Sequence, residues 1–84
     1  MNKVKVWDAG ADKGDERYTV LASKYAYIVG ESTETPGFVD VKNIQVLPIG
    51  QIDEKSMDSL YPTINPKDLP EVIKNAVKER AKNV

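Results

Sequence analysis

The chain has 84 residues, which is enough for one domain but too few for a second hydrophobic core. Its 12 Lys and Arg residues against 13 Asp and Glu residues leave a formal net charge of −1, so no strong field attracts nucleic acid or an anionic membrane. The absence of Cys and His excludes disulfides, thiolate catalysis and a histidine general base. We therefore expect a single domain over residues 1–84 that is not an enzyme and binds no cofactor.

The N-terminal residues predict a first β-strand. Val4 and Val6 alternate with Lys5 and Trp7, which places the valines on one face and the other two side chains on the opposite face. Residues 8–16 hold two glycines and four acids without periodicity, a pattern typical of a loop.

Two more strands are predicted over residues 17–22 and 25–29, which are rich in β-branched and aromatic side chains. Only Ser23 and Lys24 separate them, so we expect a tight hairpin, although this pair is unusual for a two-residue turn. The polar residues 31–37 end in Pro-Gly and predict a loop.

The middle of the chain is ambiguous. Residues 38–39 and 44–47 predict one or two short strands that end near Pro48. Residues 53–60 fit either a helix of one or two turns or an irregular segment, and both interpretations stay open.

The C-terminal segment predicts an amphipathic helix, because apolar residues recur at helical spacing from Leu69 to Val77. Asp68 is placed to act as N-cap, with Glu71 completing a capping box and Pro70 in the first turn. A helix of this length is marginal alone and must pack on the sheet. The expected fold class is α+β: a small antiparallel sheet of three to four strands with one C-terminal amphipathic helix packed on a face.

The loop after the first strand is the candidate cation site, because Asp8, Asp12 and Asp15 offer the oxygen ligands that Ca²⁺ and Mg²⁺ prefer. Its spacing departs from that of an EF-hand, with Gly10 at the third position and Lys13 at the sixth. A solvated acidic turn is the simpler interpretation. We expect no metal site here.

The aromatic residues allow two interpretations. Trp7, Tyr18, Tyr25 and Tyr27 could form a stacking platform for single-stranded nucleic acid. Residues 1–66 carry 7 basic and 10 acidic residues, a net charge of −3, which disfavours a phosphate backbone. Tyr25 and Tyr27 share a strand face with Val29, so we expect core packing for these two side chains and no nucleic-acid partner.

Catalytic motifs are not recognisable. The segment that starts at Gly30 lacks the Lys and the second Gly of a phosphate-binding loop, and its hydroxyl side chains have no His to activate them. Glu31 and Glu34 could pair as in glycosidases, but neighbouring carboxylates in a loop more often serve solubility.

Protein binding is the expected role of the segment over residues 31–58, which has six acids and two lysines. We expect this segment to form a long acidic rim around a few large apolar side chains. The candidate binding residues are Glu31, Glu34, Asp40, Asp53, Glu54, Asp58 and Tyr61.

Four motifs carry a family resemblance: Asp-x-Gly at residues 8–10, Glu-Arg-Tyr-Thr-Val at 16–20, Pro-Gly-Phe at 36–38 and Asp-Leu-Pro-Glu at 68–71. Together they resemble small uncharacterised proteins of bacteriophages and prophages. The resemblance implies a phage or mobile-element origin, the host cytoplasm as location and a host protein as partner.

The expected function is therefore that of a small phage accessory protein that acts by protein–protein binding, for example by inhibiting a host defence protein. A small ligand- or nucleotide-binding module and a structural or oligomerising module are the two alternatives. No apolar run approaches the roughly 20 residues of a membrane span, so we expect no membrane partner.

Overall fold

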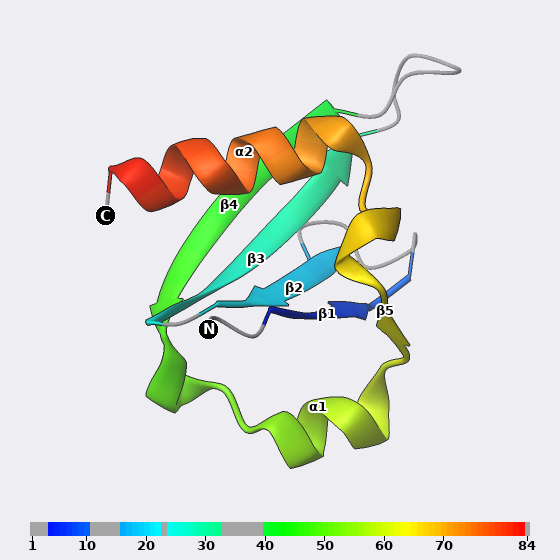
Figure 1. The fold of residues 1–84 in the computed structure, drawn as a ribbon. Helices are drawn as coiled ribbons and strands as arrows, with labels where there is room; N and C mark the ends of the chain where they lie inside the picture. The colour runs from blue at the N-terminus through cyan, green and yellow to red at the C-terminus, as the bar shows by residue number, and fades with distance from the viewer. Residues whose placement is uncertain (1–3, 11–15, 23, 33–39, 84) are drawn as a thin grey trace.

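The computed structural model describes residues 4–10, 16–22, 24–32 and 40–83 of the chain. Within these residues the fold has five β-strands, two α-helices and two short 3₁₀ turns (Figure 1). In chain order they are β1 (Lys5–Asp8), β2 (Tyr18–Leu21), β3 (Tyr25–Ser32), β4 (Asp40–Pro48), a 3₁₀ turn (Ile49–Gln51), α1 (Glu54–Leu60), β5 (Thr63–Ile64), a second 3₁₀ turn (Pro66–Asp68) and α2 (Glu71–Lys82).

The strands form one antiparallel sheet in the order β4-β3-β2-β1-β5. Strands β1 to β4 are sequential neighbours, and β5 returns to pair with the other edge of β1. The register places Val6 opposite Val20, Val20 opposite Tyr27 and Tyr27 opposite Val46. These four side chains form a row on one face because side chains directly opposite each other share a face.

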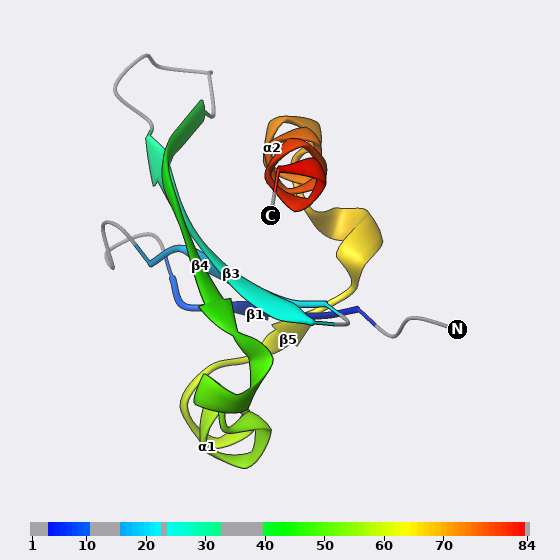
Figure 2. The same ribbon diagram turned by 90° about the vertical axis from the view of Figure 1, so that its left-hand side faces the viewer.

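Both faces of the sheet are covered. Figure 2 shows α2 on the concave side of the curled sheet and α1 on the opposite side. The cluster between the sheet and α2 contains Val6, Tyr18, Val20, Tyr27, Val29, Leu69 and Ile73. The cluster on the α1 side contains Trp7, Leu21 and Ala26, with Ile52, Met57 and Tyr61 packed against them.

The α+β class, the antiparallel sheet and the C-terminal helix are confirmed, while the described residues hold more elements than the three to four strands and one helix expected. The additional strand β5 has only two residues, too few for an alternating pattern to reveal. The additional helix α1 lies in the segment that the sequence left open. The hairpin between β2 and β3 is confirmed, with the amide of Ala22 donating to the carbonyl of Tyr25.

The start of α2 differs from the expected capping box. Leu69 and Pro70 are extended, with ψ angles of 138° and 142°, and the helix begins at Glu71. Leu69 precedes Pro70 and is therefore driven out of the α region, so the helix cannot begin at Leu69. Asp68, which ends a 3₁₀ turn, is for this reason not the N-cap. The carbonyl of Pro70 accepts the first helical bonds, from the amides of Ile73 and Lys74.

The packing of α2 on the sheet gives a stability prediction. Ile73 is fully buried in the cluster between α2 and the sheet, so Ile73→Asp would bury an unpaired charge. We expect the free energy of unfolding to fall by about 3 kcal/mol or more, measured by urea denaturation. Asn75→Asp introduces the same side chain at an exposed position of α2 and should change stability little. Equal midpoints for the two variants would show that α2 is not docked.

Candidate functional site

The expected acidic rim is divided between two ends of the molecule. Glu31 and Asp40 lie near the paired ends of β3 and β4, whereas Asp53, Glu54, Asp58 and Tyr61 belong to the α1 segment on the opposite side of the sheet (Figure 1). Glu34 lies outside the described residues. Residues 40–48 are the strand β4, so the segment 31–58 is not one long loop. Within β4, Val41, Ile44 and Val46 pack against the core, and polar residues lie between them in the sequence.

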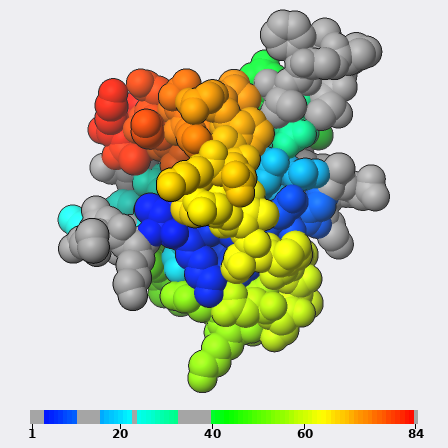
Figure 3. Space-filling model, turned by 45° about the vertical axis from the view of Figure 1, so that its right-hand side comes forward, coloured from blue at the N-terminus to red at the C-terminus, as the bar shows by residue number. Residues whose placement is uncertain are grey.

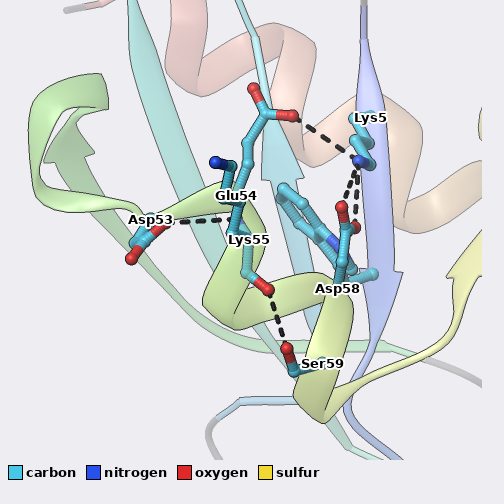
Figure 4. Close-up of polar contacts among 7 residues, drawn as sticks. Lys5, Asp53, Glu54, Lys55, Asp58 and Ser59 are labelled. Atoms are coloured by element: carbon cyan, nitrogen blue, oxygen red, sulfur yellow. Dashed lines mark hydrogen bonds and ion pairs between the residues drawn. The ribbon is translucent and has the colours of Figure 1, made fainter.

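Asp58 joins α1 to the first strand. Its Oδ1 accepts a hydrogen bond of 2.9 Å from Nε1 of Trp7, and its two carboxylate oxygens lie 2.9 and 3.0 Å from Nζ of Lys5 (Figure 4). The same ammonium lies 3.5 Å from Oε2 of Glu54 and 5.2 Å from the centre of the Trp7 ring. The hydrogen bond matters because Trp7 is fully buried and its N–H needs a partner.

The neighbouring candidates on α1 also have structural contacts. Asp53 is the N-cap of α1, with Oδ1 accepting from the amide of Lys55 and Oδ2 from the hydroxyl of Ser56. Tyr61 and Met57 pack against the Trp7 cluster. The apolar centre expected for an acidic docking surface is thus part of the second core. Leu60 remains 68% exposed on this helix.

The contact between Asp58 and Trp7 can be tested by fluorescence, because Trp7 is the single tryptophan of the chain. Asp58→Ala would leave the buried Nε1–H without an acceptor and loosen α1. We expect a red-shifted emission and faster quenching by acrylamide. Asp58→Asn keeps an oxygen acceptor and should preserve most of the native emission. Glu54→Ala removes a Lys5 contact only, and a red shift of the same size in this control would contradict the assignment.

The same contacts predict a pH dependence. Hydrogen bonds from Lys5 and then from Trp7 hold the pKa of Asp58 below its usual value. The folded state therefore binds the proton less readily than the unfolded state, so this contribution is complete above about pH 4 and is lost as the pH falls through the folded pKa. We expect the urea midpoint to fall more steeply below about pH 4 in the wild type than in Asp58→Asn. Parallel acid limbs would show that Asp58 contributes nothing.

Asp8 pairs with an arginine. Its carboxylate lies 3.2 Å from Nε of Arg17 and accepts a hydrogen bond from the amide of Gly10, which has a φ of 97°. Nε of Arg17 also lies 3.8 Å from Oε2 of Glu31. Among the described residues no group of three acids is arranged to hold a metal ion. The other two cation candidates, Asp12 and Asp15, lie outside the described residues.

The aromatic side chains pack in the interior. Trp7, Tyr18 and Tyr27 are at most 5% exposed, and Tyr25 is partly buried against the same cluster as Val29. The expectation of core packing for Tyr25 and Tyr27 is confirmed. These rings do not form an open stacking platform within the described part of the chain.

An apolar groove runs between α2 and the sheet. Its volume is about 250 Å³, and its lining residues are Val4, Val20, Ala22, Pro66, Leu69, Lys74, Val77 and Lys78. In the space-filling view of Figure 3, the orange and red α2, the yellow segment after β5 and the blue first strand lie around this face. Val4 is 44% exposed, so this wall of the groove is open to solvent.

The polar side chains of the groove lining are two lysines of α2. Lys74 and Lys78 are four residues apart and therefore lie on the same side of the helix. The opposite wall is formed by the apolar Val4, Val20 and Ala22. The exposed surface of the groove is almost wholly apolar, so the two lysines line it with the aliphatic stems of their side chains.

A smaller hollow lies on the other face of the sheet. It has a volume of about 120 Å³ and is lined by Ala9, Glu16, Thr19, Ile28, Ile52, Met57 and Tyr61. Ligand pockets usually measure about 300–1,000 Å³, so this hollow is too small to enclose a cofactor-sized molecule.

Sequence reasoning did not find the groove. Part of its lining comes from Val4, which precedes β1, and from Ala22, which follows β2. Neither residue has a pattern that marks it as a binding residue. The one available signal was charge: residues 67–84 carry five basic and three acidic residues, a net charge of +2. This positive charge lies largely on α2, whereas the acidic candidates Asp53, Glu54 and Asp58 belong to the α1 segment on the other face of the sheet.

Comparison with protein-family models, curated proteins and solved structures gave no match for the chain. Within the described residues no helix is both long and apolar enough to cross a membrane.

Proposed function

We propose that the protein acts by binding another protein, and that the groove between α2 and the sheet is the docking surface. The observation that carries the proposal is an apolar groove of about 250 Å³ that is open to solvent and has two lysines on one wall. An open apolar surface with charged residues at its margin is typical of a protein-binding site.

The size of the groove supports a protein partner. It is open to solvent and has room for one or two apolar side chains, whereas pockets for small ligands enclose most of the ligand's surface. Such anchors supply much of the binding energy in protein interfaces. This favours protein binding over the alternative of a small ligand- or nucleotide-binding module.

The chemistry of the chain favours binding over catalysis. It has no His and no Cys, and its candidate carboxylates Asp8, Asp53 and Asp58 are engaged in an ion pair, a helix cap and a hydrogen bond to Trp7. Groups fixed in this way stabilise the fold. Following the resemblance to phage proteins, we propose a host protein as the partner and inhibition of a defence protein as one form of the function.

The proposal can be tested by selecting short random peptides against the immobilised full chain. We expect enriched peptides that bind the wild type and lose affinity about tenfold or more for Val4→Glu, which places a charge in the apolar wall. Val4 precedes β1 and is 44% exposed, so this variant should keep its fold, as circular dichroism would verify.

The matched control is Leu60→Glu, which makes a similar change at an exposed residue of α1, on the other side of the sheet. It should bind the selected peptides as the wild type does. Enrichment of no peptide, or equal affinity of the wild type and Val4→Glu, would contradict the proposal.

A further inference from the structure

The outer edge of β4 is open within the described part of the chain. β4 comes first in the strand order β4-β3-β2-β1-β5, so among the described residues only β3 pairs with it. Figure 2 looks onto this edge of the sheet, and neither described helix crosses in front of β4 there. At the opposite edge, β5 has two residues and offers little backbone for pairing, whereas β4 has nine. A further strand would therefore add to β4.

The backbone of β4 has hydrogen-bonding groups that point to this open side. The amide of Ile49, just after β4, donates to the carbonyl of Lys24, just before β3. Residues that exchange backbone hydrogen bonds alternate along an antiparallel pair with residues that do not, so positions 47 and 45 also bond to β3. Ile44 and Val46 alternate with these positions. Their N–H and C=O groups therefore point away from β3, toward the open side.

Residues 43–47, with the sequence Asn-Ile-Gln-Val-Leu, lack the features that usually protect an edge strand. Such features are charged side chains, proline and β-bulges. In β4 they lie at the ends of the stretch, as a register shift between residues 41 and 43 and as Pro48. The side chains of Ile44 and Val46 lie on the α2 side of the sheet and are only partly buried. An uncharged stretch of this kind with open backbone groups is suited to pair with another strand.

The stretch is complementary to itself in one antiparallel register. When Gln45 of one copy lies opposite Gln45 of a second copy, Ile44 lies opposite Val46 on both sides of the axis. The outward groups of the two copies then meet, and each Ile44–Val46 pair exchanges two backbone hydrogen bonds. The two Gln45 side chains can donate to and accept from each other. Residues 43–47 carry no charge, so no like charges are opposed within the stretch.

We infer that the protein forms a symmetric dimer in which the β4 strands of two copies pair antiparallel about a two-fold axis at Gln45. The sheet then continues through both copies, and the two open edges close each other, as in an isologous interface. A second copy is the occupant because it brings the matching uncharged stretch in the matching register. No residue that lines the groove between α2 and the sheet belongs to β4, so this interface is separate from the proposed docking surface.

Charges placed at the two-fold axis test the register. Gln45 is exposed, and its side chain lies on the face away from α2, since its cross-strand partner Ile28 lines the hollow on the α1 side. We expect sedimentation equilibrium to show a dimer for the wild type. Gln45→Glu and Gln45→Lys should each weaken it about threefold or more, because like charges then face each other. An equimolar mixture of the two variants should form heterodimers and recover the association.

Asn43→Glu is the matched control, because it adds the same charge to another exposed residue of the stretch. In the inferred register the two residues at position 43 are offset by about 14 Å along the strands. This distance exceeds the screening length of about 8 Å at physiological salt, so the variant should dimerise nearly as the wild type does. Circular dichroism would verify the fold of each variant. A wild type that stays monomeric up to about 1 mM, an equal loss in Gln45→Glu and Asn43→Glu, or no recovery in the mixture would overturn the inference.

A disulfide reports the same register without a change in charge. The chain has no Cys, so a single introduced cysteine can form a disulfide only between two copies. The two Cα atoms at position 45 would lie about 4.5 Å apart, a distance that a disulfide spans. We expect Gln45→Cys to oxidise to a covalent dimer and Asn43→Cys to stay largely monomeric on a non-reducing gel. Equal cross-linking of both, or a dimer dissolved by Val4→Glu and not by Gln45→Glu, would contradict the β4 interface.

Discussion

The fold depends on the burial of two neighbouring residues of β1 on opposite faces of the sheet. Val6 and Trp7 are both fully buried, Val6 in the cluster beneath α2 and Trp7 in the cluster above α1. β1 can bury both because it lies between β2 and β5 and each of its faces has a helix-containing layer on it. The Trp7–Asp58 hydrogen bond then joins α1 to a buried side chain of the second core.

This arrangement explains why the open groove is on the α2 side. In Figure 1, α2 crosses the part of the sheet made by β3 and β4. Val4, which precedes β1, and Ala22, which follows β2, line the groove together with residues of α2; Val4 is exposed and Ala22 is only partly buried. On the other face the apolar residues of the α1 segment fill the space under Trp7. Of the two hollows described above, the one on the α2 side is the larger, about 250 Å³ against about 120 Å³.

The sequence predicted the elements whose pattern is local. Alternation at Val4 and Val6 and helical spacing from Leu69 to Val77 correspond to β1 and α2, because burial of one face imposes a period. The cap at Asp68 was wrong because Pro70 constrains its predecessor, a local effect that outweighs the capping pattern. The groove was not predictable, since it depends on how α2 is placed over strands that are distant in the sequence. The acidic candidates Asp53 and Asp58 have structural roles that only the three-dimensional neighbours Ser56 and Trp7 reveal.

The central claim is that recognition takes place in the groove between α2 and the sheet. The most direct measurement is an amide chemical-shift map by NMR of the full chain, titrated with a peptide selected from the random library. The account predicts the largest shifts at Val4, Val20, Ala22, Val77 and Lys78, with little change at Ile52, Met57 and Leu60 on the opposite side. Shifts concentrated on the α1 segment, with the groove residues unchanged, would contradict it.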